Sequence, residues 1–263
     1  MSPLAVTQPG APADWLADRL PEGAEPLLVA EIGPVALGLE EGPPTLGVVI
    51  AMPVPWYLSL SEGVDCLEVP AEGDRPALWV REVRGFLRLA RRSHPEVYEL
   101  AKSPRRHLDG GLGGELEALM AAGWSRQAIA GHAFALAKRA LPTYFDPRQG
   151  GTLVKYLHVV RPLLMVEALR ADPAALPPVD LAALLARGVP GADPGLADDL
   201  LWLAGQAATP PEARDTARRA GLDRWINDLL DRAEATLAAL PAEPPPLEAA
   251  ETLFRRLIGA AAS

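Results

Sequence analysis

The pattern of apolar and polar positions along the chain changes near Arg81. Before it, short apolar runs are separated by glycine and proline, which is typical of strands joined by turns. These runs cover Leu27–Ile32, Leu46–Met52, Val64–Val69 and Ala77–Val80, after an opening helix predicted at Trp15–Leu20. From Arg81 onward, alanine, leucine and arginine dominate and apolar residues recur at helical spacing. The first part is therefore predicted to form a sheet and the second part to be helical.

Polar residues and prolines mark where several of these helices begin or break. Ser125 is a candidate N-cap for a helix through Ala140, and Asp180 for one through Arg187. Pro162 is expected to kink or break the helical segment in which it lies. We interpret the glycine cluster at residues 110–114 as a hinge, because no lysine and serine of a phosphate loop follow it. The predicted fold class is α+β: a mixed sheet with flanking helices at residues 1–108, then an α-helical domain at residues 109–263.

Length and composition indicate the size of the core and the cellular compartment. With 263 residues and 49% hydrophobic content, the chain can bury one large core or two modest ones. A single cysteine, Cys66, excludes an internal disulfide and favours a reducing compartment. The N-terminus lacks a basic segment followed by an apolar one, and no apolar run is long enough to cross a membrane. We therefore expect a cytoplasmic protein without a membrane partner.

Charge is unevenly distributed along the chain. A net charge of −9 argues against strong nonspecific DNA binding, which depends on neutralising phosphates. Between Arg81 and His107, however, basic residues far outnumber acidic ones. On a helix that begins near Arg81, the arginines Arg84, Arg88 and Arg91 would form one stripe, opposite an apolar face. Such a stripe is either a solvated surface or a contact for a phosphate-rich ligand.

Two short motifs carry a resemblance to a known family. The segment from Glu31 to Gly38 reads EIGPVALG, and the segment from Trp56 to Leu60 reads WYLSL. They resemble the glycine turn and the W-Y-L-S motif of the YcgL-like nucleotidyltransferases, relatives of the RNA-repair branch of the DNA polymerase beta superfamily. Gly33 and Gly38 match the glycines of the turn. This resemblance implies a nucleotidyltransferase-like sheet domain followed by the helical domain.

The reactive positions of the motif differ from the family pattern. Pro34 occupies the position of the family's serine and Val35 that of its arginine, and no aspartate lies between Gly33 and Trp56. Nucleotidyl transfer by this family depends on Mg²⁺ ions held by carboxylates, and proline and glycine provide no side-chain oxygen for them. The nearest substitutes for the missing aspartates are Glu31, Glu40, Glu41, Asp65 and Glu82. We therefore expect neither a metal site nor a cofactor, with Mg²⁺ bound only if these carboxylates converge.

The second half follows the family pattern more closely. The run from Gly131 to Arg139 and the run from Lys155 to Leu164 resemble two of its helices. In the family, the matching groups would face a cleft between the two domains and bind phosphates. The candidate phosphate-binding residues are Arg84, His132, Lys138, Lys155 and Arg161. The alternatives are that Lys155 and Arg161 form ion pairs between helices and that His132 is a core residue.

Three functions remain open from the sequence. The first is a catalytically inactive nucleotidyltransferase that binds a nucleotide, an RNA end or a partner protein in the inter-domain cleft. The second is an active Mg²⁺-dependent enzyme with relocated carboxylates, and the third is a scaffold without a ligand. Converging carboxylates beside Gly33 would favour the enzyme, a cleft lined by Lys138, Lys155 and Arg161 the binder, and a cleft filled with side chains the scaffold.

Overall fold

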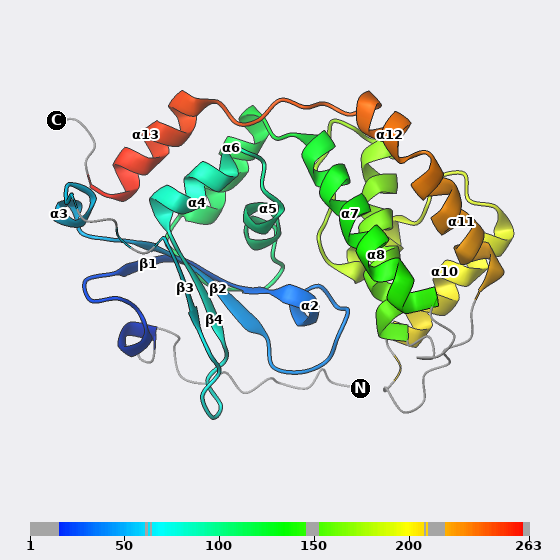
Figure 1. Ribbon diagram of the computed structural model, residues 1–263, viewed down its shortest axis with the longest axis horizontal. Helices are drawn as coiled ribbons and strands as arrows, with labels where there is room; N and C mark the ends of the chain where they lie inside the picture. The colour runs from blue at the N-terminus through cyan, green and yellow to red at the C-terminus, as the bar shows by residue number, and fades with distance from the viewer. Residues whose placement is uncertain are drawn as a thin grey trace.

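A computed structural model describes residues 16–60, 63, 65–145, 153–207, 209 and 219–259, without the side chains of residues 143–145, 153–155 and 207. It confirms the α+β class (Figure 1). One mixed sheet has the strand order β3-β4-β2-β1-β5. The strands are β1 (Glu25–Ile32), β2 (Thr45–Ala51), β3 (Cys66–Val69), β4 (Leu78–Glu82) and β5 (Arg106–Asp109). β2 and β4 are parallel, whereas the other neighbouring strands are antiparallel.

Alternation along the strands divides their side chains between two cores. In β1, Leu28 and Ala30 belong to the large core shared with the helices, whereas Val29 belongs to a smaller core on the opposite face. Successive side chains of a strand point to opposite faces, so an uninterrupted apolar run indicates a strand buried on both sides. The smaller core also contains Leu16, just before the 3₁₀ helix η1 (Ala17–Arg19).

Helices α4 (Val83–Ala90), α5 (Pro95–Ala101) and α6 (Leu112–Ala122) lie above the sheet in Figure 1. The apolar face predicted for α4 is buried through Val83, Phe86, Leu87 and Ala90. Two short helices, α2 (Gly33–Ala36) and α3 (Val54–Tyr57), follow β1 and β2. They place the glycine turn and the WYLSL segment at opposite sides of the sheet in this view (Figure 1).

The helical region is built around α7 (Arg126–Phe145) and α8 (Leu153–Ala171). It also contains α9 (Leu181–Arg187), α10 (Pro194–Ala207), α11 (Ala220–Asp231) and α12 (Ala233–Ala239). The predicted N-caps are confirmed, because Ser125 Oγ accepts from Ala128 N at 3.0 Å and Asp180 Oδ1 from Ala183 N at 2.8 Å. Helix α8 continues through Pro162, so of the predicted kink or break the break is absent.

The last described helix, α13 (Leu247–Leu257), returns to the sheet and packs on α4 and α6 (Figure 1). The strand β5 lies across the predicted boundary at residues 108 and 109, and the large core contains residues from both sides of it. Gly113 and Gly114 of the expected hinge belong to α6. Across the part of the chain that the structure describes, every helix is too short or too polar to span a bilayer.

Candidate functional site

The glycine turn keeps its shape through bonds within the backbone. Gly33 and Gly38 have φ angles of +79° and +74°, a left-handed conformation that glycine adopts without the strain of a side chain. The amides of Leu37, Gly38 and Leu39 donate to carbonyl oxygens of residues 33–35 at 2.9–3.1 Å. Pro34 has no N–H to offer. The amides of Leu37, Gly38 and Leu39 are therefore already used within the turn, and Pro34 cannot donate to a phosphate.

Glu31 is the candidate carboxylate closest to the turn, and it is already paired. Its side chain is buried near the end of β1, where Oε2 lies 2.9 Å from Arg105 Nη1 and Oε1 3.2 Å from His107 Nε2. Both partners come from β5 or the residue just before it. Ser103 Oγ also donates to the Glu31 carbonyl oxygen at 2.7 Å. Sequence reasoning missed these partners because it did not predict β5, although they lie in the basic segment that it identified.

The loop after the turn contacts the helical region. Glu40 Oε1 lies 3.0 Å from His158 Nε2 on α8, and both side chains are partly exposed. The amide of Leu181, the first residue of α9, donates to the Leu37 carbonyl at 3.0 Å. Glu41 is exposed in the same loop. The turn is therefore fixed against α8 and α9, and the Glu40 carboxylate is directed toward a histidine.

Glu82 lies at the other end of the sheet and caps a helix. Leu46 of β2 pairs with Leu78 at the turn end of β4, so Glu82 is roughly 13 Å further along the strand. Its buried carboxylate accepts from Arg84 N at 2.6 Å, Gly85 N at 3.1 Å and Tyr57 Oη at 2.7 Å. Burial raises the pKa of Tyr57, and the Glu82 hydrogen bond adds to this shift. Glu82 is therefore the N-cap of α4.

Asp65 lies beside this helix start rather than beside the turn. Its carbonyl accepts from Glu82 N at 3.1 Å, and a side chain added at Gly85 would meet the Asp65 carboxyl group. The candidate carboxylates are thus divided between two ends of the sheet. Among the described residues, no group of three or more histidine, cysteine, aspartate or glutamate side chains is arranged to hold a metal ion.

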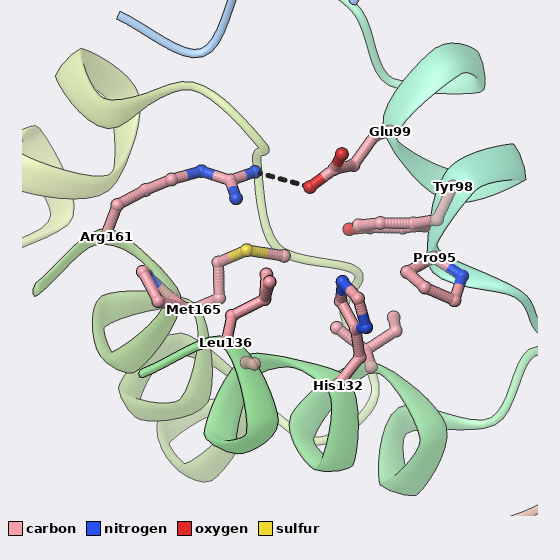
Figure 2. A pocket seen from close by; sticks show the side chains of 10 residues that line it. Pro95, Tyr98, Glu99, His132, Leu136, Arg161 and Met165 are labelled. Atoms are coloured by element: carbon pink, nitrogen blue, oxygen red, sulfur yellow. Dashed lines mark hydrogen bonds and ion pairs between the residues drawn. The ribbon is translucent and has the colours of Figure 1, made fainter. Parts of the chain in front are cut away.

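Two of the candidate phosphate-binding residues, His132 and Arg161, line a small cavity between α5, α7 and α8 (Figure 2). Arg161 is buried, with Nε 2.7 Å from the Val179 carbonyl and Nη2 3.1 Å from Glu99 Oε1. Burial lowers the pKa of Arg161, whereas the Glu99 carboxylate raises it. The remaining space is about 10 Å³, which is room for about one water molecule.

The other side chains around this cavity are also in structural roles. Tyr98 Oη donates to the Pro177 carbonyl, and burial raises the pKa of this phenol. The half-buried His132 faces the cavity from α7 (Figure 2), and burial lowers its pKa. Met165 and Leu136 complete the apolar lining. Arg161 thus forms an ion pair between helices, as in one of the two alternatives that the sequence left open.

The remaining candidates do not converge on this cavity. Lys138 is exposed on α7, and Lys155 lies in the first turn of α8, with its side chain outside the described residues. Arg84 lies on α4, with its guanidinium carbon 5.3 Å from the Trp56 ring centroid and 5.4 Å from that of Tyr57. The structure therefore separates Arg84 from the residues on α7 and α8.

Comparison with known proteins identifies the family. No curated protein matches the chain significantly. The family model RlaP, described as the RNA repair pathway DNA polymerase beta family, matches residues 24–256, from the start of β1 into α13. This match confirms the resemblance to a polymerase-beta-type nucleotidyltransferase. Because it covers most of the chain, the protein belongs to the RNA repair pathway DNA polymerase beta family.

Proposed function

We propose that this protein is a non-catalytic member of its family, which acts by binding rather than by nucleotidyl transfer. The observation that carries the proposal is the separation of the candidate carboxylates. Glu31 is paired with Arg105 and His107 near the turn, while Glu82 caps α4 at the far end of the sheet. Two-metal phosphoryl transfer needs carboxylates that hold ions about 3.5–4 Å apart.

The active alternative would require several rearrangements at once. Glu40 would have to leave His158, and Glu31 would have to exchange two basic partners for a metal ion. Proline at position 34 removes one amide that could bind the triphosphate, and the bonds within the turn use the amides of Leu37, Gly38 and Leu39. These three features together favour loss of the reaction over relocation of the metal site.

The cavity beside Arg161, between the two predicted domains, also argues against a nucleotide bound there. Arg161, the buried cation that the family pattern places there, is bonded to Glu99 and to the Val179 carbonyl. A space of about 10 Å³ is far below the roughly 300 Å³ of a small-molecule site. A nucleotide would have to break the Arg161–Glu99 pair and separate α5 from α8. We infer that partners bind on the surface, and the family's description makes an RNA end the first to test.

The test is a calorimetric titration with ATP, in Mg²⁺ and again in EDTA, joined to a transfer assay with labelled ATP and RNA. We expect no Mg²⁺-dependent binding and no labelled RNA. The Glu31→Gln variant tests the only candidate carboxylate on β1, and Glu234→Gln, exposed on α12, is the matched control. Mg²⁺-dependent binding or transfer that is lost in Glu31→Gln and kept in Glu234→Gln would overturn the proposal.

A further inference from the structure

An open groove of about 580 Å³ is lined by residues of α4 and α13 and by the two residues after α4. Both helices lie above the sheet in Figure 1, whereas α2, with the glycine turn, lies at the right-hand side of the sheet. Its α4 wall carries a series of arginines, and its α13 wall carries apolar residues and one acid. The principal lining residues are Arg84, Arg88, Arg91, Arg92, Glu251 and Phe254. This volume is within the range of ligand-binding sites, whereas the cavity beside Arg161 is not.

Three of the four arginines that line this groove have no acidic partner among the described residues, unlike several other arginines of the molecule. Arg81 pairs with Glu96 at 2.8 Å, Arg105 with Glu31 at 2.9 Å and Arg170 with Glu167 at 2.8 Å. In contrast, the side chains of Arg88, Arg91 and Arg92 form neither ion pairs nor hydrogen bonds within the described parts of the chain. Their charges are therefore available to a ligand.

Arg84 is positioned without being neutralised. Its guanidinium is held over the rings of Trp56 and Tyr57, and Glu82 Oε2 reaches it only at the 4.0 Å limit of an ion pair. The Glu82 carboxylate already accepts from two amides and a phenol. The Nε atoms of Arg84 and Arg91 are buried without a hydrogen-bond partner among the described residues. Neither guanidinium has a hydrogen-bond acceptor within the described residues, so their remaining N–H groups can donate to an anionic ligand in the groove.

The opposite wall does not cancel the positive charge. Glu251 is the one acid of the groove lining, and its Oε2 lies 3.2 Å from Arg255 Nη2 on the same helix. Phe254 lines the groove next to the arginines and packs edge-on against Tyr57, with ring centroids 5.3 Å apart. The groove therefore combines a positive wall with a partly exposed aromatic ring.

The spacing of the positive charges indicates a ligand with several phosphates. Arg84 and Arg88 occur at successive turns of α4, and Arg91 is the C-cap residue that continues the row; helical turns are about 5.4 Å apart along the axis. A single phosphate contacts one or two guanidiniums, whereas a row of them suits a chain with a phosphate at every unit. Positive grooves with aromatic side chains, on which bases stack, are the usual solution for single-stranded nucleic acids.

We propose that the groove between α4 and α13 binds the sugar-phosphate backbone of a single-stranded nucleic acid, with a base against Phe254. The net charge of −9 does not oppose this, because it confines attraction to the groove and disfavours nucleic acid elsewhere on the surface. Binding here requires no metal ion and no movement of the inter-domain residues. The proposal therefore stands or fails independently of the question of catalysis.

The test is fluorescence anisotropy with a labelled single-stranded RNA of about 12 nucleotides, in EDTA, at about 50 and 200 mM NaCl. The same DNA sequence, the RNA duplex, ATP and inorganic tripolyphosphate serve as competitors. The groove variant is Arg88→Gln/Arg92→Gln, because both side chains are exposed and their loss leaves the core intact. The matched control is Arg187→Gln/Arg232→Gln, which makes the same change of charge on the exposed surface of the helical region.

We expect the single strand to bind and the groove variant to weaken binding by about tenfold or more. The slope of log K against log salt should fall by about 0.7 for each phosphate contact removed. The control pair should bind as the unmodified protein does, and so should Glu31→Gln. Better competition by the RNA or the DNA strand would identify the preferred sugar, and either result supports the site. Absence of binding, an equal loss in both arginine pairs, or equal competition by tripolyphosphate, ATP or the duplex would overturn it.

Discussion

Arg161 shows how a residue with a binding-site signature can serve the packing of the protein. Its guanidinium is buried at 2% exposure between the Glu99 carboxylate and the Val179 carbonyl. Removing such a charge from water is costly, and the interaction with its partners offsets that cost only while both are present. The pair therefore links α8 to α5 and to the segment before α9. We therefore expect substitutions in this pair to lower the free energy of unfolding.

The Arg161→Met substitution should lower the free energy of unfolding by about 3 kcal/mol, because it leaves Glu99 and the Val179 carbonyl without their donor. Glu99→Gln should cost about as much, because an amide oxygen keeps the hydrogen bond but leaves the buried guanidinium without its counter-charge. Urea denaturation measures both. The double variant Arg161→Met/Glu99→Leu should be more stable than Arg161→Met alone. If it is not, the two side chains are not energetically coupled.

His132 should make stability depend on pH in the same region. Burial lowers its pKa, with His94, Arg161 and Arg139 contributing in the same direction and Glu99 opposing them. The folded protein therefore binds this proton more weakly than the unfolded chain, whose histidine pKa is about 6.5. Stability should be lost as pH falls from about 6.5 toward the lower folded pKa.

Urea denaturation at a series of pH values compares the unmodified protein with His132→Asn. The other histidines are present in both proteins, so the difference between the two profiles isolates His132. The variant should lose less stability between neutral and acidic pH. Parallel profiles would show that His132 takes up its proton equally well in both states.

At the scale of elements, Glu82, one of the candidate carboxylates from the sequence, has a structural role at the start of α4. Glu82 accepts the amides of Arg84 and Gly85 and the hydroxyl of Tyr57, so it joins α4 to the end of β4 and to α3. The first amides of a helix have no partner within it, and a side-chain cap satisfies them. Glu82 is therefore needed for the helix that forms the arginine wall.

Replacing Glu82 by alanine should lower the free energy of unfolding by about 2 kcal/mol, because three donors lose their acceptor. Asp65→Ala is the matched control: its carboxylate is exposed, and only its backbone carbonyl bonds to Glu82 N. It should change stability by less than about 0.5 kcal/mol. Denaturation followed by circular dichroism measures both, and equal losses would contradict the capping role.

Local patterns predicted most elements, but not those that depend on distant partners. Four strands and the capped helices α7 and α9 lie within a few residues of their expected positions. Strand β5 was missed because Arg106–Asp109 shows no apolar alternation and pairs with an edge of β1 far away in sequence. The partners of Glu31 were missed for the same reason. The stripe on α4 was predicted, whereas the groove depends on where α13 packs.

At the scale of the whole molecule, the sheet and the helices share their main core. Leu28 and Val49 of the sheet belong to the same cluster of buried residues as Leu163 of α8 and Leu253 of α13. The Glu40–His158 contact and the bond from Leu181 to Leu37 add polar links between the two regions. Two regions that share buried surface are expected to unfold together.

Hydrogen exchange should therefore report one unfolding event. The slowest amides of β2 and of α8 should exchange with the same free energy of opening, and added urea should lower both with the same slope. Exchange measured by mass spectrometry on peptides from each element tests this. Two distinct free energies would instead support the predicted division at residues 108 and 109 as a boundary between independently unfolding domains.

Helix α13 packs on α4 but is synthesised much later, so α4 lacks this contact during part of translation. Helix α4 ends at Ala90, but Ala250 and Phe254, which line a groove with α4, belong to a helix that begins only at Leu247. At about 5–20 residues per second, the interval between the two is on the order of ten seconds. Until then, apolar side chains such as Leu87 lack this cover, so nascent chains that stop before α13 should be substrates for chaperones and proteases.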